Sequence, residues 1–397
     1  MEINYFYEKV STKTTLQAQL SMKPEKKFEF SEVINLQTVQ KIGASIKKVW
    51  ADFEADKLEE KVKPTLSTLA FKNRANLIAE VLYELLPDDF GTAGQIILDS
   101  FGQELKNPDF TGESVFVYMP YGVYVSRYGL AEEHFDLSTQ FLYEMTKRFS
   151  AEFAIRPFLN KFPQKMLHKL QEWVKDESQH VRRLVSEGTR PRLPWASRVR
   201  VYDENYMVIM DLLAALRNDS ELYVRRSVAN HLNDLAKDRK DLVLTNLTAW
   251  NKKPNKNIEW LTKHALRTLI KAGDAGALKI LGFSDNPQVE VLNFELEKTQ
   301  LKLGEKLVFS FDIQSKIEKK QGLIIDYIIY FKKSNGKQSP KVFKLKVLQL
   351  DGNKLVELNK KQTFQQLSTR VLYEGMHGVE LQINGKPFGK KEFELSF

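Results

Sequence analysis

The 397-residue sequence contains no cysteine. This absence excludes a disulfide framework, thiolate metal sites and a cysteine nucleophile, and it suits a reducing compartment. No segment offers the roughly 20 consecutive apolar residues that a membrane-spanning helix needs. The opening residues, MEINYFYEKVSTKTT, are too polar for a signal peptide, so we expect a cytoplasmic protein. P-loop and dinucleotide-binding motifs are also absent, which removes those nucleotide-binding classes.

The chain is basic, with a net charge of +9 and a pI of about 9.2. Basic chains of this size often bind nucleic acid or an anionic surface. Ribosome-associated proteins and ordinary basic enzymes share the property, so charge alone leaves nucleic acid as one partner class among several.

The hydrophobic pattern changes character near Pro287. Before it, apolar residues recur at three- and four-residue steps, as in LSTLAFKNRANLIAEVLYELLP, which predicts successive helices. After it, segments such as KLVFSFDIQ and LIIDYIIYF alternate or run apolar between Gly- and Asn-containing turns, which predicts strands. We therefore predict a multidomain protein: an all-α HEAT-like helical-repeat solenoid over residues 31–287, followed by an all-β immunoglobulin-like sandwich over 288–397.

Two further features concern this domain organisation. The linker SDNPQ is short, which predicts a docked sandwich domain. The lysine-rich strand edges of the predicted sandwich suit either DNA contact or protection against aggregation. Residues 1–30 are polar with scattered aromatics, and they suit either a packed N-terminal arm or a partly disordered tail.

An internal repeat lies in the helical region. DESQHVRRLVSEG, which begins at Asp176, aligns with DSELYVRRSVANHLND, which begins at Asp219. Val181 and Val224 are 43 residues apart, and Leu261 of a weaker third copy, NIEWLTKHALRTLI, follows 37 residues later. A period near 40 with two helices per unit is typical of HEAT-type repeats.

The arginines of these copies are the first candidates for binding a polyanion. On a helix, Arg182, Arg183, Arg225 and Arg226 point away from the apolar stripe. Stacked repeats would align Arg183 and Arg226 with Lys263, in a row that suits a phosphate backbone. The alternative is a solvated face with local ion pairs.

The loop TRPRLPW after the first copy adds two more cations. Pro191 and Pro194 fix its backbone, so Arg190 and Arg192 would lose little freedom on binding. We expect Trp195 to anchor this loop in the core. The predicted DNA-binding residues are Arg182, Arg183, Arg190, Arg192, Arg225, Arg226, Lys263 and Arg267.

Several long strings resemble the AlkC branch of the AlkC/AlkD DNA glycosylase superfamily. They include LAFKNRANLIAEVLYELLPDDF, RFSAEFAIRPFL, the two Val-Arg-Arg copies and WLTKHALRTLIKAGDAGALKILGF, and together they span roughly residues 31–287. Some members carry a C-terminal immunoglobulin-like domain. The resemblance implies a monomer that binds duplex DNA with alkylated bases. It further implies excision of 3-methyladenine and 3-methylcytosine without flipping the lesion into a deep pocket.

Cleavage of an N-glycosidic bond builds positive charge on the sugar, and a nearby carboxylate can stabilise that charge and orient a water. A cationic alkylated base leaves without prior protonation, so one acid is enough. The resemblance favours Glu152, because its segment looks like the one that presents the catalytic acid. The alternative for Glu152 is an ion pair with Arg156 at i+4. Asp176 is the second candidate, against the alternative of a helix N-cap.

Aromatic side chains complete the predicted site. Trp173 could stack on the sugar or attract a cationic base, although core packing is at least as good an account. Tyr121 and Tyr124 are candidates for a cleft wall, and Arg156 for a lesion contact. The histidines show no metal-ligand spacing, so we expect no metal and no cofactor. No lysine stands out as a Schiff-base nucleophile, which favours a monofunctional glycosylase. The rival predictions are a non-catalytic solenoid that binds damaged or structured DNA and a scaffold for protein partners.

Overall fold

The computed structural model describes residues 30–105, 113–200, 202–366 and 370–397. The predicted N-terminal arm, residues 1–30, therefore lies almost wholly outside the described residues. Two separate hydrophobic cores are present, one within the helices and one within the strands. None of the helices in the described part of the chain has the length and apolarity that crossing a bilayer requires.

The first region is helical, as the three- and four-residue spacing predicts. Its elements are η1 (Phe30–Val33), α2 (Leu36–Val49), α3 (Ala55–Leu66), α4 (Phe71–Leu85), α5 (Phe90–Asp99), η2 (Glu113–Tyr118), α6 (Met119–Tyr128), η3 (Glu132–His134), α7 (Phe135–Thr146), α8 (Ile155–Lys161), α9 (Pro163–Trp173), α10 (Gln179–Gly188), α11 (Tyr202–Leu216), α12 (Leu222–Leu235), α13 (Lys240–Trp250), α14 (Lys256–Ala265), α15 (Arg267–Lys271) and α16 (Ala275–Ile280).

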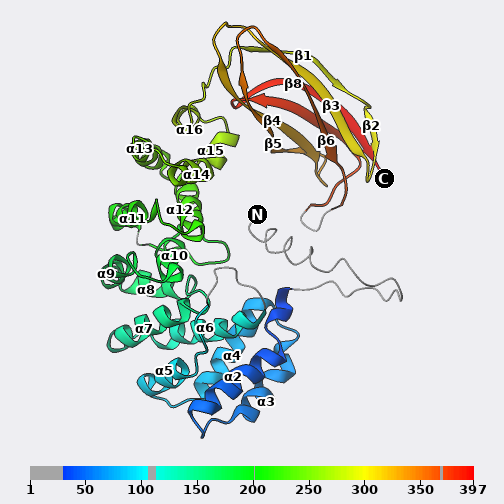
Figure 1. Ribbon diagram of the computed structural model, residues 1–397. Helices are drawn as coiled ribbons and strands as arrows, with labels where there is room; N and C mark the ends of the chain where they lie inside the picture. Colours follow the sequence, from blue (N-terminus) through cyan, green and yellow to red (C-terminus); the bar gives the residue numbers. More distant parts are fainter. Residues whose placement is uncertain (1–29, 106–112, 201, 367–369) are drawn as a thin grey trace.

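These helices stack into a curved array (Figure 1). Helices α9, α11 and α13 lie on the outer side of the curve, and α10, α12 and α14 lie on the inner side. The inner helices pack on one another in sequence, α10 on α12 and α12 on α14. Their predicted apolar stripe is confirmed, since Val181, Leu184, Val224, Val228 and Leu261 are fully buried. The aligned sequence copies thus occupy successive layers of the array.

The first two copies begin with the same hydrogen-bonded turn. Asp176 Oδ1 accepts from the Ser178 amide at 2.7 Å, and Asp219 Oδ1 accepts from the Glu221 amide at 2.9 Å. An arginine six residues after each aspartate closes the turn. Arg182 Nη1 donates to the backbone carbonyls of Asp176 and Glu177. Arg225 Nη1 donates to the corresponding carbonyls of Asp219 and Ser220. The aspartate thus fixes the turn before the helix. This role is structural, like the N-cap alternative given for Asp176, but the N-cap position itself is Ser178.

The C-terminal region is a two-sheet sandwich. Strands β1 (Val289–Leu296), β3 (Lys306–Ser315) and β6 (Leu355–Thr363) form one sheet in the order β1-β3-β6. Strands β2 (Gln300–Lys302), β8 (Lys386–Ser396), β7 (Gly375–Ile383), β4 (Gln321–Lys332) and β5 (Gln338–Leu350) form the other, in that order. Alternating side chains of β3, including Phe309 and Phe311, enter the core between the sheets.

The sandwich docks on the last helices of the array (Figure 1). Gln382 Nε2 donates to the Lys271 carbonyl at 3.0 Å, and Asn384 Nδ2 donates to the Ser284 carbonyl at 2.8 Å. Gly273 and Gly385 meet backbone to backbone, with φ of +72° and +81°. A Cβ on Gly385 would lie 2.0 Å from the Gly273 Cα, so only glycine permits this approach.

Candidate functional site on the inner helices

A continuous chain of ion pairs runs from the turn before α8, through α10 and the loop after it, to the C-terminal end of α12. Arg183 Nη1 lies 2.9 Å from Glu152 Oε2, and Arg183 Nη2 lies 3.6 Å from Glu187 Oε1. The same Glu187 oxygen lies 2.6 Å from Arg190 Nη1, and Arg190 Nη2 lies 2.9 Å from Asp234 Oδ2. Acidic and basic groups therefore alternate along the chain, so that each charge has an opposite neighbour.

Glu152 forms the more exposed end of this chain. It precedes α8 in a short turn, and its side chain is 17% exposed. Ser150 Oγ donates to Glu152 Oε2 at 2.9 Å. The Arg183 guanidinium lies over the Tyr223 ring, 4.9 Å from its centroid. Burial disfavours the Arg183 cation, but Tyr223, Glu152 and Glu187 outweigh that effect and raise its pKa. A permanent cation therefore fixes one oxygen of the Glu152 carboxylate.

The other end of the chain is buried. Glu187, Arg190 and Asp234 are each at most 5% exposed. Ser227 Oγ donates to Glu187 Oε2 at 2.6 Å. Burial raises the pKa of Glu187, but Arg183, Arg190 and Ser227 outweigh it, and the pKa falls below its usual range. Glu187, Asp234 and Tyr223 were not predicted as part of the site. For Glu187 the sequence offered a signal in its spacing, i, i+4 from Arg183 and i, i+3 to Arg190.

The predicted pair between Glu152 and Arg156 is wrong. Arg156 is 1% exposed and donates to three backbone carbonyls instead. Its Nε bonds Ser197 at 2.6 Å, and its Nη1 bonds Gly188 and Arg190 at 2.9 Å each. The guanidinium holds the loop after α10 from inside. Contrary to the predicted lesion contact, it does not reach the surface.

Three predicted phosphate ligands also serve internal contacts. Arg182 Nε lies 2.7 Å from Asp219 Oδ2 and thereby ties the first copy to the second. Arg225 is 9% exposed and bonds the carbonyls at the start of its own helix. Arg190 is 4% exposed within the ion-pair chain. For these three, the alternative of local ion pairs and hydrogen bonds fits the structure better than phosphate binding.

Other predicted cations lie nearer solvent. Arg192 is exposed and pairs with Asp238 at 2.5 Å. Arg226 is half-buried, and Lys263 is exposed. Arg267 donates to the His264 carbonyl and to Asn230 Oδ1. These four side chains remain predicted phosphate ligands, whereas Arg183 is engaged in the ion-pair chain, as the alternative of local ion pairs describes.

The aromatic predictions fall mainly on core residues. Tyr121 and Tyr124 are each 1% exposed, so they do not form a cleft wall. Trp173 is 7% exposed and packs on Tyr143, with ring centroids 5.9 Å apart. Its core alternative therefore describes it better than a lesion contact. Trp195 was expected in the core, but 54% of its surface is exposed.

Asp176, the second candidate acid, lines a separate cleft of about 640 Å³. Tyr143 donates its hydroxyl to Asp176 Oδ2 at 2.9 Å, and the other oxygen holds the Ser178 amide. Both oxygens thus have structural partners. Three further carboxylates, Glu104, Glu177 and Glu221, line the same cleft. Within the described residues, no group of three His, Cys, Asp or Glu side chains is arranged to hold a metal ion.

His231 adds a pH-dependent element beneath the ion-pair chain. It is fully buried, its Nδ1 lies 2.9 Å from the Ser186 carbonyl, and burial lowers its pKa to about 3. In the unfolded chain an ordinary histidine takes up a proton near pH 6.5. The unfolded state therefore binds more protons between pH 6.5 and 3, and stability falls as the pH drops through that window.

The free energy of unfolding, measured with urea, should fall between pH 7 and pH 5 in the wild type. We expect this fall to be about 2 kcal/mol smaller in His231→Gln. His168→Gln is the matched control, because the His168 side chain is 73% exposed. Equal acid sensitivity in both variants would contradict the assignment to His231.

Taken together, the residues define a protein of two parts, a curved helical array with a charged inner cluster and a docked β-sandwich. A family model described as "Uncharacterised protein YhaZ, C-terminal Ig-like domain" matches residues 290–397. The chain is 32% identical to the uncharacterized protein YhaZ of Bacillus subtilis over 368 residues, which cover 92% of this chain and 99% of the relative.

A solved structure shares both parts of the fold. It is the Pseudomonas fluorescens alkylpurine DNA glycosylase AlkC, bound to DNA containing an abasic site analog. The identity is 34%, the TM-score is 0.84, and the match covers 92% of this chain and 99% of that one. The chain belongs to the AlkC family.

Proposed function

We propose that the protein is a monofunctional DNA glycosylase of base excision repair. Its substrates are cationic N-alkylated bases in duplex DNA, 3-methyladenine and 3-methylcytosine, and it acts as a monomer in the bacterial cytosol. The observation that carries the proposal is Glu152, a partly exposed carboxylate held by Arg183 of the inner helix α10. The DNA-bound AlkC relative supports the same reading.

The proposed mechanism needs only one negative charge. As the bond between base and sugar breaks, positive charge develops on the deoxyribose, and the Glu152 carboxylate stabilises it. The same carboxylate orients the attacking water and accepts its proton. The base already carries a positive charge and departs neutral, so no general acid takes part. Hydrolysis by water leaves the DNA strand uncut.

Arg183 acts as a positioning residue in this scheme. It binds one carboxylate oxygen of Glu152 and is itself held by Glu187 and the Tyr223 ring. The buried part of the ion-pair chain makes this support rigid, which reduces the reorganisation needed when charge develops on the sugar. The Glu152 side chain is partly exposed, at 17%, which is compatible with a lesion that does not enter a deep pocket.

The second candidate function is DNA binding without catalysis. The observation that favours it is the ion pair itself, since a carboxylate already neutralised by Arg183 could be purely structural. Both functions require duplex DNA as partner, so binding alone does not separate them.

Incubation with methylated duplex DNA tests the proposal, with chromatographic identification of the released bases. We expect release of 3-methyladenine and 3-methylcytosine, and strands that break only after alkali treatment of the abasic product. Absence of both bases would overturn the proposed function. Strand breaks without alkali would overturn its monofunctional part.

A further inference from the structure

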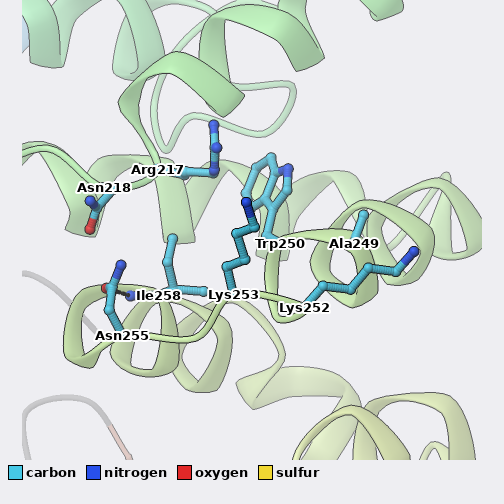
Figure 2. Close-up of a pocket in the computed structure, with 8 residues that line it drawn as sticks. All are labelled: Arg217, Asn218, Ala249, Trp250, Lys252, Lys253, Asn255 and Ile258. Atoms are coloured by element: carbon cyan, nitrogen blue, oxygen red, sulfur yellow. Dashed lines mark hydrogen bonds between the residues drawn. The ribbon is translucent and has the colours of Figure 1, made fainter.

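A second polar pocket lies on the array, away from the ion-pair chain. It forms where the turn between α11 and α12 meets the turn between α13 and α14, and its volume is about 410 Å³ (Figure 2). Its polar and aromatic lining consists of Arg217, Asn218, Trp250, Lys252, Lys253 and Asn255. No carboxylate lines the pocket, so its charge is entirely positive.

The cations gather around the tryptophan. The Arg217 guanidinium lies 5.7 Å from the Trp250 ring centroid, and it donates to the Ala214 carbonyl. Lys253 is exposed and extends toward the Trp250 ring, whereas Lys252 points away (Figure 2). Arg217 and Lys253 therefore approach one side of the pocket without an acidic residue in its lining.

The two amide side chains use their acceptor oxygens within the protein. Asn255 Oδ1 accepts from the amides of Asn257 and Ile258 at 3.0 Å each. Asn218 Oδ1 accepts from Asn257 Nδ2 at 3.2 Å. Both acceptor oxygens therefore serve the protein, so what these amide groups can offer a ligand is their Nδ2 donors. Cations and N–H donors without acceptors are the chemistry of an anion site.

A neighbouring cleft shows that the stacking of the helices does not by itself produce a positively charged lining. The cleft around Asp176 borders the same α11–α12 turn, yet carboxylates from Glu104, Asp176, Glu177 and Glu221 line it. The same architecture therefore accommodates either sign of charge, and the basic lining is a property of these particular side chains.

We propose that this pocket binds a phosphate of the duplex DNA backbone away from the lesion. The proposal rests on the proposed function for the identity of the partner. The pocket lies between the C-terminal ends of α11 and α13 and the first turn of α14, where Ile258 lines it. Helix α14 is an inner helix of the array (Figure 1), so a strand that crosses the start of α14 reaches the pocket. Its role is affinity and register on the duplex, since phosphate contacts position a protein without reading sequence.

The test measures the affinity for undamaged duplex DNA by fluorescence anisotropy at several salt concentrations. The affinity falls as salt rises, so a plot of log K against log salt has a negative slope. Each lost phosphate contact reduces the magnitude of this slope by about 0.9. We expect Arg217→Gln combined with Lys253→Ala to lower the magnitude of the slope by about 1 and the affinity roughly tenfold at 0.1 M salt. Lys253→Glu, which leaves the Arg217–Trp250 contact in place, should change the slope in the same direction.

The matched control is Lys48→Ala combined with Lys63→Ala, which removes two exposed lysines from α2 and α3. An unchanged slope in the pocket variants, or an equal fall in the control, would overturn the proposal. A second arm replaces chloride with inorganic phosphate at constant ionic strength. Phosphate that binds the wild type but not the pocket variants, with unchanged DNA slopes, would assign the pocket to free phosphate and also overturn it.

These outcomes are separable from failure of the proposed function, because the readout uses undamaged DNA and involves no base release. Bases released normally with unchanged slopes would refute only the pocket. Absence of base release with lowered slopes would refute only the glycosylase.

Discussion

Replacing Glu152 with glutamine is expected to slow the release of methylated bases at least about 100-fold. Glutamine has the size of glutamate and can still accept hydrogen bonds from Arg183 and Ser150, so the local structure should persist. It lacks the negative charge that stabilises the sugar cation. The affinity for undamaged duplex DNA should change little. Single-turnover release of 3-methyladenine measures the first effect, and anisotropy measures the second.

Two further carboxylates serve as controls for Glu152. Asp176→Asn tests the second candidate acid, and Glu177→Gln changes an exposed neighbour in the same cleft. Both oxygens of Asp176 have structural partners, so we expect Asp176→Asn to affect stability more than the rate of release. If Asp176→Asn abolished release and Glu152→Gln did not, the roles assigned to the two acids would have to be exchanged.

The fold was largely predictable because it depends on local periodicity. Three- and four-residue apolar steps place Val181, Leu184 and Val224 on the buried stripe, and two-residue alternation places Phe309 and Phe311 in the sandwich core. The turn that opens each of the first two copies was also visible, through Asp176 and Asp219. These features need only the residues within one helix, strand or turn.

The partners of the charged groups were harder to predict because they lie far apart in the sequence. A helical wheel shows that Arg182 points away from the apolar stripe. It does not show that Arg182 pairs with Asp219 of the next layer. It also suggests Glu152 as the partner of Arg156, whereas the real acceptors are carbonyls 32 to 41 residues further on. Burial of a cation is decided by such non-local contacts.

Arg190→Ala is expected to destabilise the helical array by about 3–5 kcal/mol. Arg190 is 4% exposed and lies between Glu187 and Asp234, which are also buried. Its removal would leave both carboxylates in the interior without their shared cation, and this accounts for the cost. Urea unfolding at pH 8 measures the effect.

Arg192→Ala supplies the matched comparison, because Arg192 follows in the same loop and also has a carboxylate partner, Asp238. The Arg192 side chain is 38% exposed, so water compensates its loss and we expect a much smaller change than for Arg190→Ala. The cost of Arg190→Ala should also shrink at pH 4, because buried carboxylates without a cation can take up protons there. Equal costs for the two variants would mean that the buried chain stabilises the protein no more than a surface ion pair. A cost that did not fall on acidification would mean that Arg190 acts through packing and not through its charge.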